Sequence, residues 1–142
     1  RHSFPTRRSS DLAVDSITST GAKPLLALSY MPSVIAKDGS IINPPNNWDE
    51  WSFVVQQTIE HFSGRTNRNI SNMYYEVWNE ADLPQFGSWK LSGDKNYLTL
   101  YRYAAIGSQN AKNVTSFSFG GPGTSGLYKN WIIWGKLTNT GN

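Results

Sequence analysis

The 142-residue sequence contains no cysteine, which excludes a disulfide framework and a thiolate metal site. It contains no apolar run near the ~18 residues that a membrane-spanning helix needs, so we expect no membrane span. Its two histidines lie in no cluster of His, Asp and Glu with the spacing of metal ligands, so we expect no metal. Charged residues are also few, at 16% of the chain, and the formal net charge is +3.

Most of that positive charge comes from the first residues of the chain. Residues 2–12 read HSFPTRRSSDL, which resembles the translation of a common sequencing-library adapter. We interpret residues 1–12 as adapter-derived and outside the fold; the alternative is a genuine basic arm for anionic partners. Without them the chain loses three positive charges and one negative charge, and the net charge falls from +3 to +1. The basic character therefore gives no indication of a nucleic-acid partner.

The remaining chain alternates short apolar runs with amphipathic segments. The apolar runs have the composition of strands that are buried on both faces, and the amphipathic segments have apolar residues at spacings of three and four. Such alternation predicts an α/β fold with a parallel sheet and right-handed crossovers. A barrel and an open, doubly wound sheet both satisfy the pattern. The strands are expected at 25–31, 73–78 and 114–119, and the helices at 47–62, 96–111 and 128–137.

The most informative segment is the second strand, which ends in Asn79-Glu80. Sites in parallel α/β folds are built at the carboxyl ends of strands. A carboxyl group that is partly desolvated there has a raised pKa and stays protonated near neutrality. It can then donate its proton to a leaving-group oxygen, and Asn79 beside it offers an amide to a sugar hydroxyl. The alternative is an Asn-Glu pair in an ordinary surface turn.

Strand geometry adds a condition to this interpretation. Regular alternation places Glu76, Trp78 and Glu80 on one face of the strand and Asn79 on the other. If Asn79 and Glu80 both contact a substrate, the pleat must break where the strand ends.

The segment Tyr75-Glu76-Val77-Trp78-Asn79-Glu80 resembles the fourth-strand signature of clan A glycoside hydrolases, and more narrowly that of family 39. The flanking elements resemble the same family in the same order. These are the helix containing His61-Phe62, the aromatic loop with Phe86 and Trp89, the helix with Tyr97 and Tyr101, and Gly120-Gly121-Pro122 at the end of the next strand. Roughly residues 24–135 are covered.

The resemblance implies a fold and an activity. Residues 13–142 would be a fragment of a (β/α)₈ TIM-barrel catalytic domain, covering roughly strands 3 to 5 and their helices. The activity would be hydrolysis of O-glycosidic bonds with retention of configuration, without a cofactor, on an oligo- or polysaccharide. Glu80 would be the general acid/base, and Asn79 would bind a substrate hydroxyl. Ala81 departs from the family pattern, which usually has Pro there, and this puts the loop geometry in doubt.

A retaining glycosidase also needs a nucleophilic carboxylate about 5 Å from the acid. The resemblance implies that it comes from the seventh strand, and this sequence has no Asp or Glu after Asp94. Glu76 lies four residues before Glu80, about 13 Å away along a strand. Asp82 in the adjoining loop stays open as an alternative. We therefore expect the chain to lack the nucleophile and to be inactive by itself.

Other aromatic and titratable residues are assigned by position. Trp78 and Trp89 are candidates for substrate binding. Core packing is the favoured interpretation for Trp78, whereas loop packing is an equal alternative for Trp89. Tyr30, at the end of the first strand, is expected to pack in the core or behind the site. His61 is expected to have a packing role near the end of a helix.

Two other functions remain open at this point. One is a non-catalytic carbohydrate-binding barrel that lost the nucleophile, and the other is a structural α/β domain. A polysaccharide substrate would favour an extracellular or cell-envelope location. The sequence assigns no oligomeric state.

Overall fold

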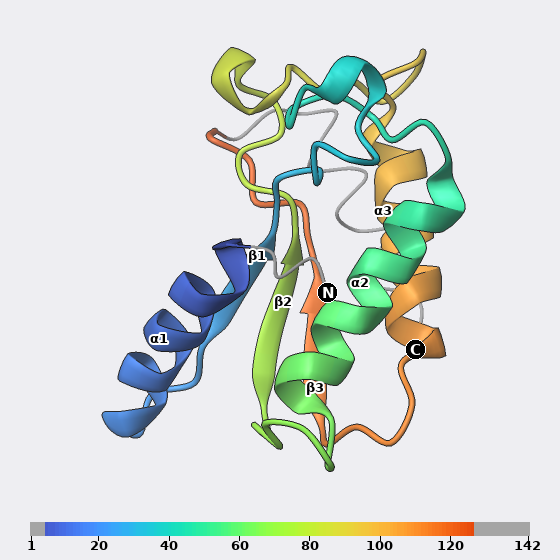
Figure 1. The fold of residues 1–142 in the computed structure, drawn as a ribbon. Coiled ribbons are helices and arrows are strands. Elements are labelled where there is room, and N and C mark those ends of the chain that lie inside the picture. The colour runs from blue at the N-terminus through green and yellow to red at the C-terminus, as the bar shows by residue number, and fades with distance from the viewer. Residues whose placement is uncertain (1–4, 127–142) are drawn as a thin grey trace.

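The computed structural model describes residues 5–126, so the helix expected at 128–137 lies outside the described residues. A three-stranded parallel sheet forms the centre, with strand order β1-β2-β3 (Figure 1). In chain order the helices and strands are α1 (Pro5–Ser19), β1 (Leu25–Leu28), α2 (Trp48–Ser63), β2 (Met73–Val77), α3 (Tyr97–Asn110) and β3 (Phe117–Gly120). Two short 3₁₀ helices, η1 (Lys37–Gly39) and η2 (Pro84–Phe86), lie in the loops. The α/β class predicted from the sequence is confirmed.

The two central helices begin as the sequence predicts. The side chain of Asn47 accepts a hydrogen bond from the backbone N–H of Asp49, and Asn96 accepts one from Leu98, both at 2.9 Å. Each asparagine therefore satisfies a backbone donor that the first turn of its helix leaves unpaired. The expected stop at Gly64 is also confirmed, because α2 ends at Ser63 and Gly64 is its C-cap.

The strands are shorter than, or displaced from, the ranges expected from composition. β1 ends at Leu28 rather than at Met31, and β3 begins at Phe117 rather than at Val114. Val114 instead forms an isolated bridge with Gly64, and the backbone N–H of Thr115 donates to the carbonyl of Ser63. The apolar character of this segment therefore serves its contact with the end of α2 and not the sheet.

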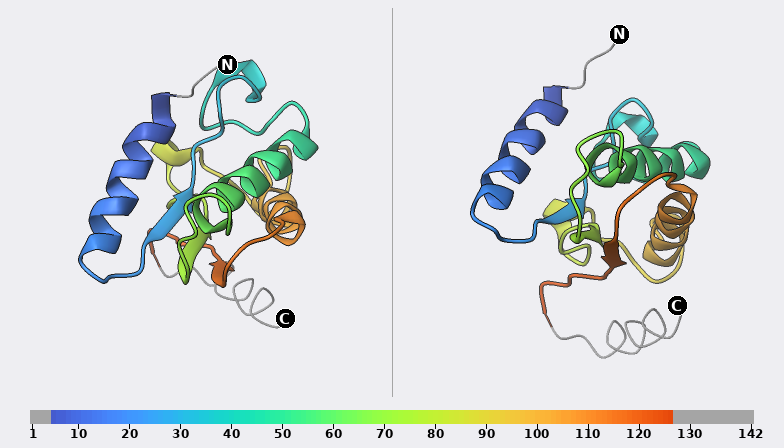
Figure 2. Two further views of the ribbon diagram at one scale, coloured as in Figure 1. Left: turned by 60° about the horizontal axis from the view of Figure 1, so that its bottom comes forward. Right: turned by 90° about the horizontal axis from the view of Figure 1, so that it is seen from below.

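Within residues 5–126, helices cover one face of the sheet and no helix covers the other. Figure 2 shows α1, α2 and α3 along the same side of the three strands. The strand residues on that side are buried, as Tyr75 and Val77 show with 1% and 0% exposure. On the opposite side Leu25 and Tyr74, which are partners in the β1–β2 register, are 58% and 44% exposed.

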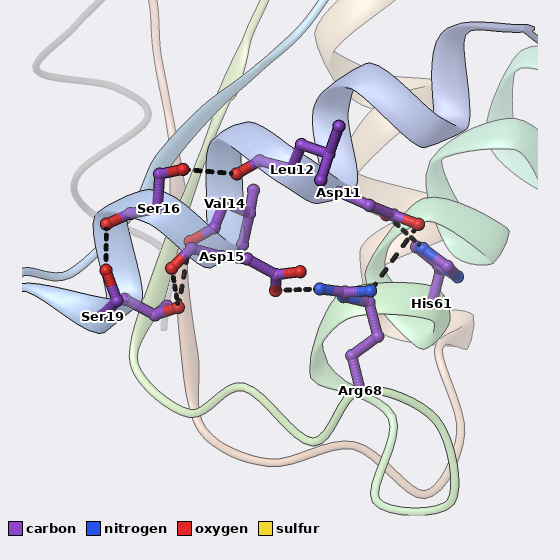
Figure 3. Close-up of polar contacts among 9 residues, drawn as sticks. Asp11, Leu12, Val14, Asp15, Ser16, Ser19, His61 and Arg68 are labelled. Atoms are coloured by element: carbon purple, nitrogen blue, oxygen red, sulfur yellow. Dashed lines mark hydrogen bonds and ion pairs between the residues drawn. The ribbon is translucent and has the colours of Figure 1, made fainter.

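The first helix includes the segment that resembles an adapter. Figure 3 shows Asp11 of α1 beside His61 of α2, with 2.7 Å between the Asp11 Oδ1 and His61 Nε2 atoms. Arg68 pairs with Asp15 and lies 3.6 Å from Asp11. Such partly exposed ion pairs contribute little to stability, typically about 0–1 kcal/mol. The packing of α1 therefore depends mainly on apolar contacts, of which buried Val14 is the clearest.

These apolar contacts are incomplete. A pocket of about 520 Å³ lies between α1, β1 and α2. Small side chains of α1, Ser9 and Ser10, line one side of it, and apolar residues such as Leu26, Val54 and Phe62 line the other. The adapter origin of residues 1–12 stays a prediction.

Candidate functional site

The pleat of β2 breaks at Trp78. Val77 and Trp78 are adjacent and both 0% exposed, whereas regular alternation would place them on opposite faces. Trp78 has a φ of 68° and Glu80 a φ of 39°, values that are uncommon outside glycine. Backbone strain of this kind costs of order 1–3 kcal/mol per residue and clusters at functional sites. The break that joint substrate contact by Asn79 and Glu80 would require is therefore present.

Asn79 and Glu80 lie at the carboxyl edge of the sheet, where each is half-buried. The carbonyl of Glu80 accepts a hydrogen bond from Leu83 N at 2.9 Å, which closes a β-turn directly after the strand. The next carbonyl, that of buried Ala81, accepts one from Trp89 N at 2.8 Å. The backbone that carries the Glu80 side chain is thus held at two successive carbonyls.

Buried indoles pack behind this edge. The ring of Trp78 makes edge contacts with Tyr30, Trp51 and Trp89, at centroid distances of 5.9, 6.3 and 5.2 Å. Its Nε1–H donates to the carbonyl of Phe86 at 2.7 Å, which ties the strand end to η2. The structure therefore gives Trp78 a packing role in the edge that carries the site residues.

Trp89 is also buried, at 1% exposure, and Lys95 Nζ lies 5.7 Å from its ring centroid. Its Nε1 has no hydrogen-bond partner within the described residues. Neither Trp78 nor Trp89 offers an exposed ring face to a ligand in this arrangement. Direct sugar contact by these two residues stays a prediction, and it requires the surrounding loop to open.

From the sequence, Tyr30 is expected only to pack in the core or behind the site. The residue is 41% exposed, and its ring stacks on Phe86 at a centroid distance of 6.0 Å. Leu28 of β1 pairs with Val77 of β2. Tyr30 and Asn79 each come two residues after this pair, so both lie just beyond the ends of neighbouring strands. Its position just beyond a strand end was the available signal for an aromatic surface beside the site.

Glu76 lies on the open face of the sheet, opposite Gly120 of β3. A Cβ atom on Gly123 would lie 2.7 Å from its Oε1 atom, so the glycine-rich segment after β3 passes close to the carboxyl group. This burial raises the pKa of Glu76 above its ordinary value. Nearby, burial also raises the pKa of Tyr97, whose hydroxyl donates to the carbonyl of Val77.

Asp82 follows Glu80 by two residues, and its side chain contacts the loop after β3. Its Oδ1 atom accepts a hydrogen bond from the backbone N–H of Ser125 at 3.0 Å, and its Oδ2 atom accepts one from the Ser125 hydroxyl. The sequence left Asp82 open as a second catalytic carboxylate. In the structure both of its oxygens are engaged by Ser125.

Residues 5–126 contain neither a metal-binding cluster nor a helix suited to a membrane. No group of His, Cys, Asp and Glu within residues 5–126 could hold a metal ion. No helix of that part of the chain is long and apolar enough to cross a membrane. His61 pairs with Asp11 at the other end of α2, away from the site edge (Figures 1 and 3).

Comparison with known proteins identifies the family of this chain. A parallel sheet with polar residues at the carboxyl end of its central strand places the chain in the α/β class, whose sites lie at that edge. The model of the family "Glycosyl hydrolases family 39" matches residues 8–136. The chain belongs to this family, and the resemblance seen in the sequence is confirmed.

A curated relative gives the family a particular example. The chain is 30% identical to a β-xylosidase of Caldicellulosiruptor saccharolyticus over 123 residues, which are 81% of this chain and 24% of that protein. The chain thus spans about a quarter of the relative's length. No solved structure matches the chain.

Proposed function

We propose that this chain is the part of a retaining glycoside hydrolase that carries the general acid/base, Glu80. The observation that carries the proposal is the pair Asn79-Glu80, half-buried at the carboxyl edge of the central strand where the pleat breaks. Membership of glycosyl hydrolases family 39 supports hydrolysis of glycosidic bonds.

The strand topology supports a barrel as the parent fold. Strand order follows chain order, and the connecting helices α2 and α3 lie on one side of the sheet (Figure 2). Right-handed crossovers that always advance in one direction place every helix on the same side. Helices also lie on one side within either half of a doubly wound sheet, so the choice of the barrel rests on membership of glycosyl hydrolases family 39. We therefore assign β1, β2 and β3 to strands 3, 4 and 5 of a (β/α)₈ barrel, whose interior is the face that exposes Leu25 and Tyr74.

The chemistry then divides between two carboxyl groups. In the first step a nucleophilic carboxylate attacks the anomeric carbon, and protonated Glu80 gives its proton to the departing glycosidic oxygen. In the second step the Glu80 carboxylate takes a proton from water, and the resulting hydroxide displaces the nucleophile from the anomeric carbon. Asn79 holds a sugar hydroxyl beside the reacting bond.

We place the nucleophile outside this chain. The sequence has no Asp or Glu after Asp94, and the Asp82 carboxylate is bound to Ser125. The family resemblance implies a nucleophile on a later strand of the proposed barrel. The protein encoded by the uninterrupted gene, here called the complete gene product, is therefore the species to assay.

Because the relative is a β-xylosidase, the first substrates to test are aryl β-xylosides and xylo-oligosaccharides. Glu80→Gln in the complete gene product should lower kcat/KM for a phenyl xyloside by about 10²–10⁴-fold, the usual contribution of a general acid. A dinitrophenyl xyloside, whose leaving group departs without a proton, should lose far less. The matched control is Glu50→Gln, an exposed glutamate in the first turn of α2, which should leave both rates unchanged.

Two results would contradict the proposal. Equal losses on both xylosides would mean that Glu80 does not protonate the leaving group. Binding of a xylo-oligosaccharide by the wild-type protein without hydrolysis of any glycoside would instead identify a carbohydrate-binding barrel.

A further inference from the structure

The turn that begins at Glu80 is fixed to the rest of the molecule through the side chain of Asp82. Glu80 and Leu83 close the turn by their backbone hydrogen bond, and Asp82 occupies its third position. The Asp82 side chain leaves the turn and meets Ser125, which follows β3 on the neighbouring strand's loop. These two hydrogen bonds from Ser125 join the turn to the loop after β3.

The partner loop is itself ordered at the point of contact. The hydroxyl of Thr124 donates to the carbonyl of Gly126 at 2.9 Å, which spans Ser125. Two residues earlier, Gly123 lies so close to the Glu76 carboxyl group that a Cβ atom would contact it at 2.7 Å. The loop after β3 therefore rests on β2 at Glu76 and is bonded to Asp82 beyond the strand's end.

We propose that Asp82 is a positioning residue, which fixes the direction of the Glu80 side chain by bonding the acid's turn to the loop after β3. This inference rests on the proposed function of Glu80. Hydrogen bonds to an ionised carboxylate are shorter and roughly twice as strong as neutral ones. A paired contact, from N–H and O–H of one residue, also fixes an orientation that a single bond leaves free.

Positioning matters because proton transfer depends on geometry. A general acid must lie within hydrogen-bond reach of the oxygen that it protonates, and a displacement of about 1 Å can cost about 10²-fold in rate. The positive φ at Glu80 gives its turn a conformation that most residues avoid. Contacts outside the turn, such as those of Asp82, stabilise that conformation.

The experiment compares two aryl glycosides of the same sugar in the complete gene product. Asp82→Ala should lower kcat/KM for the phenyl glycoside by about 10- to 100-fold, because the acid is displaced. For the dinitrophenyl glycoside, which needs no acid, the loss should stay within about threefold. The pH profile of Asp82→Ala should keep the basic limb that reports the acid, because Glu80 is still present, whereas Glu80→Gln should abolish that limb.

Milder variants keep the test informative if Asp82→Ala does not fold. Ser125→Ala removes the hydroxyl and keeps the backbone donor, and it should show a smaller loss with the same dependence on the leaving group. The Asp82→Ala/Ser125→Ala double variant should then lose no more than Asp82→Ala alone, as expected for two members of one contact. The matched control is Asp94→Asn, which changes an exposed aspartate in the loop between β2 and α3. This variant should behave as the wild type.

The outcomes separate this inference from the proposed function. If Glu80→Gln shows the leaving-group dependence but Asp82→Ala and Ser125→Ala slow both glycosides equally, Asp82 has only a structural role and the inference is wrong. If Glu80→Gln itself lacks that dependence, the proposed function fails and the inference fails with it.

Discussion

At the scale of single residues, two aromatic side chains near Glu80 differ in burial although both follow a strand. Trp78 and Tyr30 are both aromatic and both follow a strand, yet Trp78 is fully buried and Tyr30 is 41% exposed. The difference follows from the positive φ at Trp78, which turns its indole toward the helices. Of these two residues, Tyr30 is the one with a ring surface that a ligand could contact without rearrangement.

Glu76 leads to a prediction about pH. Burial raises its folded-state pKa above the ordinary value of 4.5, so the unfolded chain ionises at lower pH than the folded protein. This group therefore costs stability as the pH rises from about 4.5 through the raised pKa, and the cost persists above it. Glu76→Gln should make the complete gene product more stable at pH 7 and change it little below pH ~4. Denaturant unfolding at both pH values measures the difference.

Glu60 provides a control, because its pKa is shifted in the opposite direction from that of Glu76. Hydrogen bonding by the Gln56 side chain, with further bonds from Lys112 and Gln57, lowers the pKa of this partly buried carboxyl group, although burial by itself would raise it. Its contribution is present above the unfolded pKa and is lost as the pH falls through the folded one. Glu60→Gln should therefore reduce stability at pH 7. The same sign for both variants would contradict these assignments.

At the scale of elements, α2 and α3 approach each other at Gly107. A Cβ atom at this position would lie 2.2 Å from the carbonyl oxygen of Ser52, a backbone atom that cannot move aside by itself. Alanine normally gains about 1 kcal/mol over glycine inside a helix. Overpacking typically costs about 1–3 kcal/mol or more, and here it should exceed the gain.

Gly107→Ala should therefore destabilise the complete gene product, despite its better helix propensity. Ser108→Ala, one position along the same helix, is the control and should change the free energy of unfolding by less than about 1 kcal/mol. Chemical denaturation measures both. A stabilised Gly107→Ala variant would show that the two helices lie further apart than described.

The helix α1 leads to a prediction about the gene. Its apolar Leu12 is 64% exposed, whereas Ser10, one turn before buried Val14, lines the 520 Å³ pocket. A helix that evolved against β1 and α2 would place its apolar residue toward them. This mismatch fits our interpretation of residues 1–12 as adapter-derived.

Sequencing the genomic locus tests that interpretation. We expect the gene to encode different residues in place of positions 2–12, with a larger apolar side chain at position 10. A genomic sequence that reads HSFPTRRSSDL at these positions would contradict it.

At the scale of the whole molecule, the described sheet has unpaired edges on β1 and β3 and an uncovered face. Unpaired edges invite association with other chains. Leu25 and Tyr74 add exposed apolar surface to that face. Residues 13–142 expressed alone should therefore be poorly soluble or lack a cooperative thermal transition, and should hydrolyse no glycoside.

Calorimetry of that polypeptide measures its thermal transition, and sedimentation measures its state of association. A monomeric preparation with a cooperative transition would contradict it. Such a result would mean that the three strands and their helices suffice as a folding unit.

The sequence by itself determined the type and order of the elements from β1 to β3, whereas the helix α1 was not expected from it. Asn47 and Asn96 start their helices through side-chain hydrogen bonds to the backbone two residues later, an interaction that is local and therefore readable in a sequence. The apolar runs fixed the strands to within a few residues, and the motif ending in Asn79-Glu80 identified the family. These features depend on neighbours along the chain.

Only the tertiary structure decided which residues meet across the chain. The engagement of Asp82 by Ser125, 43 positions later, and the burial of both Trp78 and Trp89 depend on how separate loops pack. The positive φ at Trp78 that breaks the pleat is a further case, because alternation along a strand predicts the opposite face. Long-range packing selected these conformations, and no local pattern records it.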